Sequence, residues 1–159
     1  MKGNRFNMKI IKATEKELDI INEIVSKTIR ISYGECYNQE IVEFFLMIHS
    51  KERILQDILH HSMYLIEDNG EYVGTGCAKD DHITRVYILP QFHGKGYGTA
   101  IMDLLEKEIS EKYDEAFLDP SSSAIPFYER RGYQIISHED CRMKQGSVLP
   151  HDVMKKNLR

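Results

Sequence analysis

Three glycines at alternate positions, Gly94, Gly96 and Gly98, lie between an apolar run typical of a strand and an amphipathic run typical of a helix. Glycine weakens a helix start, but it lets the backbone approach a ligand closely. The first amide groups of a helix have no intrahelical partner, and the helix dipole favours negative charge beside them. Residues 93–99 therefore predict a loop that binds phosphate through its backbone.

Other phosphate-binding loops differ from this one in spacing. A Walker loop needs G-x-x-x-x-G-K-[ST], and no Lys-Ser or Lys-Thr pair follows a glycine at that distance. A Rossmann loop needs G-x-G-x-x-G within a β–α–β unit, whereas this sequence has G-x-G-x-G after a run that predicts antiparallel strands. A glycine-rich turn without a ligand is disfavoured, because it would weaken the helix without benefit.

A second informative segment, residues 118–133, contains the pattern S-x-x-A-x-x-F-Y-x-x-x-G-Y. Together with the earlier H-G-K-G-Y-G loop, it resembles the two landmarks of the GNAT superfamily of N-acetyltransferases. These are Q/R-x-x-G-x-G/A between a strand and a helix, followed by N-x-x-A-x-x-F-Y-x-x-x-G-F/Y. The resemblance covers residues 9–158, with His93 where the family has Gln or Arg and Ser121 where it has Asn.

The resemblance implies an α/β fold with a central mixed sheet flanked by helices. It also implies an enzyme that uses acetyl-CoA as cosubstrate, whose acetyl group is attacked directly by a primary amine of a small molecule or peptide. Strand residues 86–88 are expected to pair with the pantetheine arm and to stabilise the thioester oxygen through a backbone amide. The residues that the resemblance assigns to acetyl-CoA binding are Val86, Tyr87, Ile88, His93, Gly94, Lys95, Gly96, Tyr97, Gly98, Thr99 and Ser121.

Two side chains are candidates for proton transfer in this reaction. The resemblance places Tyr128 at the family's general-acid position, and a phenol with an unperturbed pKa near 10 stays protonated at neutral pH. The base is less defined, because Asp81, His82 and Thr84 all stand near the start of the same strand. His82 is the preferred base, since an unperturbed imidazole titrates near pH 6.5. An ordered water as base, with His82 an exposed loop residue, is the alternative.

The resemblance assigns amine specificity to the first two helices and the last strands, here residues 31–48 and 138–151. The first of these ranges is rich in acidic and aromatic side chains, including Glu35, Glu40 and Glu43. Such a wall suits a cationic amine, although an ordinary amphipathic surface has the same composition. The amine itself, the acyl length and the oligomeric state, monomer or homodimer, are not specified by the sequence.

Hydropathy patterns and turn residues predict the elements that position these residues. Thr14 and Glu17 form a capping box before an amphipathic helix, Ser50 is expected to interrupt the helical range 39–61, and Asn69-Gly70 is a hairpin turn. Further helices are expected at 99–112 and 121–131. Strands are expected at 9–13, 63–67, 72–78, 83–89, 116–118 and 133–137, and the tail 148–158 is a candidate for one more. This order predicts a mixed sheet with packed helices.

Composition narrows the possible partners of the chain. It has 159 residues with a formal net charge of −4, which disfavours nucleic acid as a partner. It has no apolar run of membrane-spanning length and no secretory signal, which predicts a cytoplasmic protein with no membrane partner. Three widely spaced cysteines predict reduced thiols and no metal site. We expect one domain at residues 8–159 after a disordered extension at 1–7.

Two other functional classes fit parts of this sequence. A catalytically silent acyl-CoA-binding regulatory module would keep the fold and tolerate the departures at His93 and Ser121, although the presence of Tyr128 argues against it. A nucleotide-binding domain would use the glycine loop for ATP and require magnesium, but the chain has no Walker-type Ser or Thr for that ion.

Overall fold

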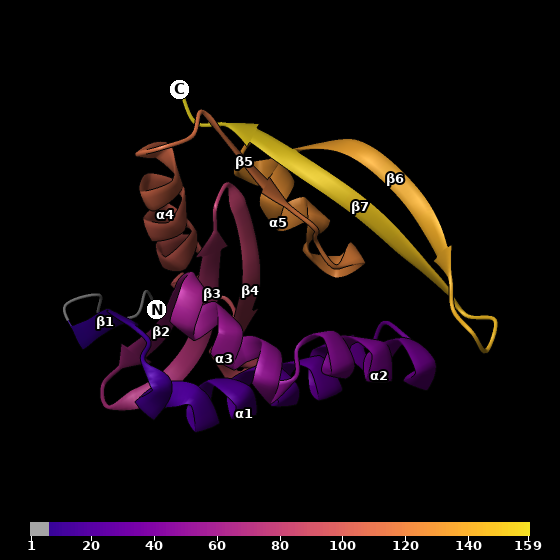
Figure 1. Ribbon diagram of the computed structural model, residues 1–159, viewed down its shortest axis with the longest axis horizontal. Coiled ribbons are helices and arrows are strands. Elements are labelled where there is room, and N and C mark those ends of the chain that lie inside the picture. The colour runs from indigo at the N-terminus through magenta and orange to yellow at the C-terminus, as the bar shows by residue number, and fades with distance from the viewer. Residues whose placement is uncertain (1–6) are drawn as a thin grey trace.

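The fold comes from a computed structural model, in which residues 7–159 are described (Figure 1). Apart from Asn7, the predicted disordered extension lies outside the described residues. The seven strands form one sheet in the order β1-β2-β3-β4-β5-β7-β6. The strands are β1 (Met8–Lys12), β2 (Ser62–Asp68), β3 (Glu71–Lys79), β4 (His82–Ile88), β5 (Glu115–Leu118), β6 (Gln134–Arg142) and β7 (Val148–Asn157).

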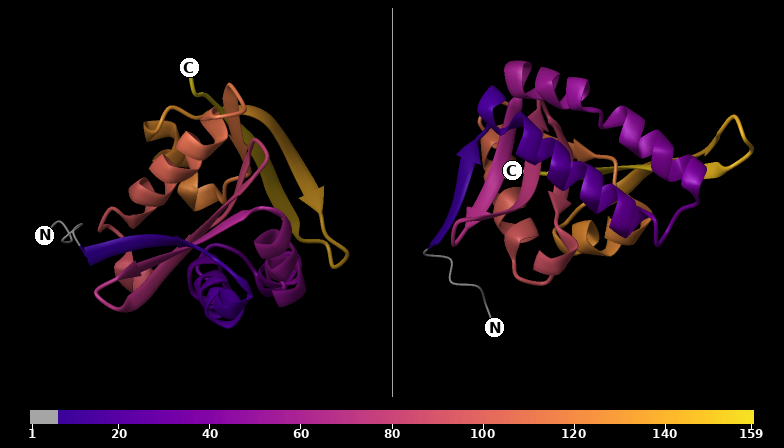
Figure 2. Two further views of the ribbon diagram at one scale, coloured as in Figure 1. Left: turned by 60° about the vertical axis from the view of Figure 1, so that its left-hand side comes forward. Right: turned by 90° about the horizontal axis from the view of Figure 1, so that it is seen from below.

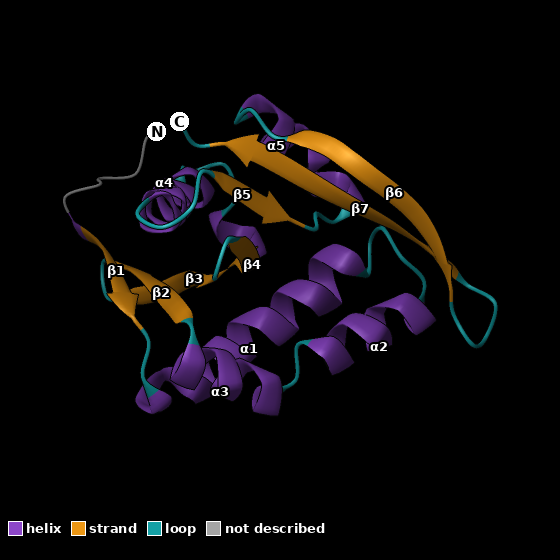
Figure 3. Ribbon diagram, turned by 45° about the horizontal axis from the view of Figure 1, so that its top comes forward, coloured by secondary structure: helices purple, strands orange, loops and turns teal. Residues whose placement is uncertain are grey.

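Helices cover both faces of the sheet, so the predicted mixed sheet flanked by helices is confirmed (Figures 2 and 3). Helices α1 and α3 contact strands β2, β3 and β4 on one face, and α4 contacts β3, β4 and β5 on the other. Helix α2 extends from this layer toward the β6–β7 hairpin (Figure 3). The helices are α1 (Leu18–Thr28), α2 (Gln39–Ile48), α3 (Lys51–His60), α4 (Tyr97–Ser110) and α5 (Ile125–Arg130).

The local chemistry of the sequence produces the predicted breaks between elements. The Thr14–Glu17 capping box is present, and the Ser50 side chain accepts from the Arg53 amide and caps α3, which divides the range 39–61 into two helices. Asn69 and Gly70 have φ values of 53° and 80°, as a tight hairpin turn requires. The candidate strand in the tail forms as β7 and pairs with both β5 and β6.

Strands β4 and β5 are the only parallel pair in the sheet as described, and they separate after two residue pairs. His82 lies opposite Phe117 and Ile83 opposite Leu118, and no further pairing follows in residues 7–159. A bulge in β4 at Arg85, whose φ is 52°, changes the register with β3. The Arg85 carbonyl accepts from the Thr75 hydroxyl at 2.8 Å. The remainder of β4 therefore has an edge that diverges from β5.

Gly76 in β3 allows α4 to lie close to the sheet. A Cβ at this position would be 2.5 Å from Ile101 Cγ1 and 3.1 Å from Leu105 Cδ1. We expect Gly76→Val to lower the free energy of unfolding by about 1–3 kcal/mol through overpacking, measured by urea denaturation. Ile101→Ala in the same chain removes the main clash, so the double variant should lose less stability than the sum of the two single variants. Losses that add exactly would contradict the close approach.

Candidate active site

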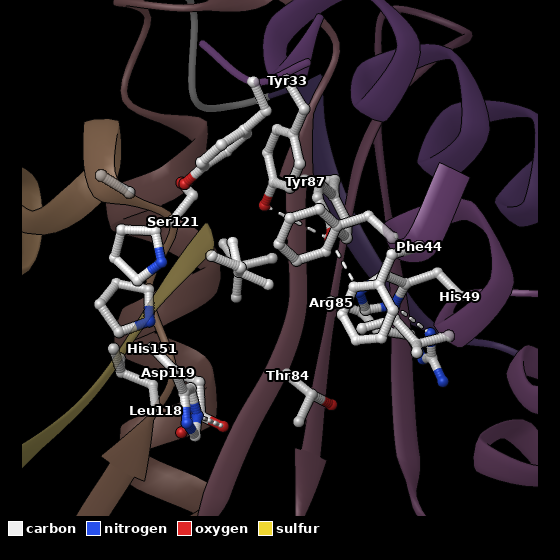
Figure 4. Close-up of a pocket in the computed structure, with 18 of the residues that line it drawn as sticks. Tyr33, Phe44, His49, Thr84, Arg85, Tyr87, Leu118, Asp119, Ser121 and His151 are labelled. Carbon is white, nitrogen blue, oxygen red and sulfur yellow. Dashed lines mark hydrogen bonds and ion pairs between the residues drawn. The ribbon is translucent and has the colours of Figure 1, made fainter. Parts of the chain in front are cut away.

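A pocket of about 370 Å³ lies where β4 and β5 diverge (Figure 4). Strand β4 and the α2 region form one wall, and the end of β5, the segment after it and the β6–β7 hairpin form the other. Its aromatic lining residues are Tyr33, Tyr37, Phe44, Phe45, Tyr87 and Tyr128. The pocket also brings together the predicted residues His82 and Val86 of β4 with Ser121, which follows β5.

Tyr128, the predicted acid, lies on α5 and is 8% exposed. Its ring packs edge-on against Phe127 and Tyr133, with centroids 5.1 and 5.8 Å away. Burial raises the pKa of Tyr128 above its usual value of 10, so the hydroxyl keeps its proton at neutral pH. Helix α5 thus holds a protonated, rigidly packed phenol at the pocket.

The glycine loop adopts the backbone geometry expected of an anion-binding helix start. Gly94 and Gly96 have φ values of 76° and 88°, and Gly96 is the N-cap of α4. Within the described chain, no side chain caps this helix, and the intrahelical ladder starts with the Ala100 amide bonded to the Gly96 carbonyl at 3.0 Å. The preceding amides, including those of Gly98 and Thr99, are therefore free of intrahelical bonds.

Three side chains of this loop have contacts within the protein. His93 Nε2 donates to the Ile88 carbonyl at 2.7 Å, so the ring ties the loop to the end of β4. Tyr97 is buried and its hydroxyl donates to Asp68 at 2.5 Å, which leaves only its backbone available to a ligand. Lys95 lies over the Phe92 ring, 5.4 Å from its centroid. The loop therefore offers anion binding mainly through its backbone.

His82, the preferred base, belongs to a cluster that includes a carboxylate. His82 Nε2 lies 3.1 Å from Asp119 Oδ1, and His151 Nε2 lies 3.2 Å from Asp119 Oδ2. The Asp119 hydrogen bond raises the pKa of His82 above 6.5, and the two imidazoles lower the pKa of Asp119. His151 reaches Asp119 because β7 pairs directly with β5.

The aromatic part of the predicted amine-binding wall lines the pocket, but the glutamates predicted for it do not. Glu40 accepts hydrogen bonds from the Gln145 and Ser147 amides, at 2.6 and 3.1 Å, and so joins α2 to the β6–β7 turn. A hydrogen bond from the Ser147 side chain, together with these two amide bonds, lowers the pKa of Glu40. Glu35 and Glu43 are exposed and do not line the pocket. The pocket carboxylate is Asp119, and the α2 side of the pocket is mainly aromatic.

A polar network beside the aromatic wall was not predicted from the sequence. His49, at the end of α2, contacts both Tyr87 and Arg85, and Arg85 forms an ion pair with Asp57 of α3. No spacing in the sequence connects these positions, since they lie on three elements. A buried-strand position occupied by arginine was the one available signal.

Three ligand-type side chains meet on the β6–β7 hairpin. Atoms of Glu139, Cys141 and His151 lie within 4.8 Å of one another, although Glu139 is exposed. Strand pairing places Glu139 directly opposite His151, which chain spacing alone does not reveal. The geometry permits a metal contact, but His151 Nε2 already bonds to Asp119.

Comparison with known proteins gives consistent similarities. A family model described as an acetyltransferase (GNAT) domain matches residues 33–156. N-alpha-acetyltransferase 20 of Dictyostelium discoideum is 28% identical in an alignment 101 residues long, which covers 56% of this chain and 58% of that protein. The chain therefore spans less than two thirds of this relative.

No helix within residues 7–159 is both long and apolar enough to span a bilayer.

Solved structures share the fold at low sequence identity. A GCN5-related N-acetyltransferase from Rhodopseudomonas palustris has a TM-score of 0.84 at 21% identity, covering 94% of each chain. The PaiA N-acetyltransferase from Thermoplasma acidophilum, solved with coenzyme A, has a TM-score of 0.76 at 20% identity and covers 94% of this chain and 98% of its own.

Proposed function

The chain belongs to the GNAT acetyltransferase family, and we propose that it transfers the acetyl group of acetyl-CoA to a primary amine of a small molecule or peptide by direct attack. The observation that carries this proposal is the pocket between β4 and β5. There a protonated phenol, a histidine–carboxylate pair and a diverging strand edge face one space. An amine, an acid and a base for acyl transfer can therefore meet in it.

The chain's residues fit acetyl-CoA, which supplies the acetyl thioester when bound. The free amides at the start of α4 suit a pyrophosphate, and a Cβ at Gly94 would meet no atom within 4 Å, so the loop is open. The edge of β4 after Ile83 is available for pairing with an extended ligand. Ser121 lines the pocket on the opposite side, in the position the resemblance assigns to pantetheine contact.

Proton movement is assigned to two side chains. His82 accepts the proton of the attacking amine, with Asp119 holding Nε2 and stabilising the imidazolium that forms. Tyr128 holds a proton at its hydroxyl for the departing thiolate. Because burial favours the neutral phenol, the Tyr128 O–H stays available to donate a hydrogen bond to the sulfur as negative charge develops on the departing thiolate.

The pH dependence tests the base. Asp119→Asn removes the main cause that raises the pKa of His82, so we expect the acid limb of the kcat/KM profile to move to lower pH. His82→Ala should remove that limb. His138→Gln is the control, because an exposed histidine whose pKa is raised by Asp152 lies outside the pocket lining. An acid limb that stays in place in both His82→Ala and Asp119→Asn would assign the base elsewhere.

The experiment that tests the activity is thiol release from acetyl-CoA in the presence of a panel of primary amines. Isothermal titration with acetyl-CoA, and separately with ATP and magnesium, precedes it. We expect acetyl-CoA binding without metal and amine-dependent thiol release. Binding with no release for any amine would favour the catalytically silent module, and binding of ATP alone would contradict the family's cosubstrate.

A further inference from the structure

A chain of buried polar contacts runs from α3 to the pocket. Arg85 Nε donates to Asp57 Oδ2 at 2.8 Å, and both side chains are 8% exposed. Arg85 NH1 contacts His49 Nδ1, and His49 Nε2 lies 3.0 Å from the Tyr87 hydroxyl. The Tyr87 hydroxyl is in turn 3.5 Å from that of Tyr33 (Figure 4). These groups occupy α3, β4, the end of α2 and the segment after α1.

The arginine fixes the protonation pattern of His49. A guanidinium only donates, so Nδ1 of His49 must accept from Arg85 and carries no hydrogen. Burial and the positive charges of Arg85 and Arg53 lower the pKa of His49 to about 3, so the ring is neutral. A neutral imidazole carries one hydrogen, which is then on Nε2. His49 therefore donates to the Tyr87 oxygen and cannot accept a proton from it.

Counting the hydroxyl hydrogens shows whether the two tyrosines can donate a hydrogen bond to a ligand. Tyr33 and Tyr87 have two hydroxyl hydrogens and form one hydrogen bond with each other, whichever of them donates. Neither hydrogen is given to His49, because His49 is itself the donor. Ser121 also hydrogen-bonds to Tyr33 and favours its ionised form, so Ser121 donates there and takes up no tyrosine hydrogen. One hydroxyl hydrogen is therefore left over, and both tyrosines line the pocket. With the other histidine tautomer, Tyr87 would donate to His49 and none would be left.

We propose that Tyr33 and Tyr87 form a subsite that donates a hydrogen bond to a carbonyl oxygen of the amine substrate. This inference rests on the proposed acetyl transfer and specifies its acceptor class: amines that carry a carbonyl group, as amino-acid amides and peptides do. The Arg85–Asp57 ion pair acts through His49, so its members are positioning residues. Phe44 and Phe45 line the same wall and add apolar contact for the rest of the substrate.

The first test is independent of activity. Long-range 1H–15N NMR spectra of the 15N-labelled protein report the tautomer of each histidine. We expect His49 to stay neutral, with hydrogen on Nε2, from pH 8 to pH 5, while His138 titrates as the internal control. Hydrogen on Nδ1 of His49, or titration of His49 near its usual pKa, would overturn the donor polarity.

The second test is a substrate comparison. Leucinamide and 3-methylbutylamine share one carbon skeleton and differ in the carboxamide. We define the discrimination as kcat/KM for leucinamide divided by kcat/KM for 3-methylbutylamine. We expect the Tyr33→Phe/Tyr87→Phe double variant to lower this discrimination about three- to tenfold, the usual effect of one hydrogen bond. Differences in amine basicity cancel, because the same two amines are compared in both proteins.

Tyr64→Phe is the matched control. Tyr64 lies on β2 outside the pocket lining, and the variant loses a hydroxyl bonded to Glu108 of α4. Its discrimination should equal that of the parent protein. An unchanged ratio in the double variant, whether or not both kcat/KM values fall, would overturn the subsite. If no amine releases thiol, the proposed acetyl transfer fails, and the His49 spectrum still decides whether the tyrosine pair is a donor.

Discussion

Tyr128→Phe is expected to lower kcat roughly 100-fold, while the dissociation constant for acetyl-CoA stays within about twofold. The change deletes one hydroxyl and keeps the ring, so the edge-on packing against Phe127 and Tyr133 is retained. A departing thiolate without a proton donor must leave as the anion in a partly desolvated pocket, which raises the barrier to transfer. Steady-state kinetics with a reactive amine and titration of acetyl-CoA measure the two quantities.

Tyr133→Phe is the control for this prediction. Tyr133 packs beside Tyr128, but its hydroxyl donates to Glu106 at 3.0 Å on the side of α4. The control should lower stability, since Glu106 loses a buried partner, and leave kcat near that of the parent protein. A Tyr128→Phe protein with full kcat would remove Tyr128 from the mechanism and leave water as the proton donor.

Local residue chemistry accounts for most of the fold that could be predicted. The Thr14 and Ser50 caps, the Asn69-Gly70 turn and the glycine loop each act within about four residues, so their sequence patterns identify them directly. The order of helices and strands follows from such signals together with hydropathy periods. The order of elements does not show how many residues of β4 and β5 pair before the two strands diverge.

The parts of the site that escaped prediction all depend on contacts between distant segments. His151 reaches Asp119 only because β7 inserts between β5 and β6, and Arg85 meets His49 across 36 residues of chain. Glu40 illustrates the opposite error: an acidic side chain that suits a cationic ligand is used to hold the β6–β7 turn. Composition describes which groups are present, whereas packing decides which of them remain available.

Gly96→Glu is expected to abolish measurable binding of acetyl-CoA, which corresponds to a loss of at least about 100-fold. Gly96 is the N-cap of α4 with φ of 88°, a conformation that side-chain-bearing residues adopt at a cost. A carboxylate at this point would also place negative charge beside the helix amides that are expected to receive the pyrophosphate. Isothermal titration with acetyl-CoA measures the loss.

Gly146→Glu separates this effect from backbone strain and from added charge. Gly146 has φ of 96° and open space around its Cβ position, but it lies in the β6–β7 turn, far from α4 (Figure 1). The two variants therefore introduce the same residue and the same charge at a position with positive φ, and they differ only in where that position lies. Because backbone strain at either glycine destabilises the folded state, the unfolding temperatures of the two variants should fall by similar amounts. If both variants kept acetyl-CoA affinity, the α4 start would not be the phosphate site; if both lost it, general destabilisation would be the cause.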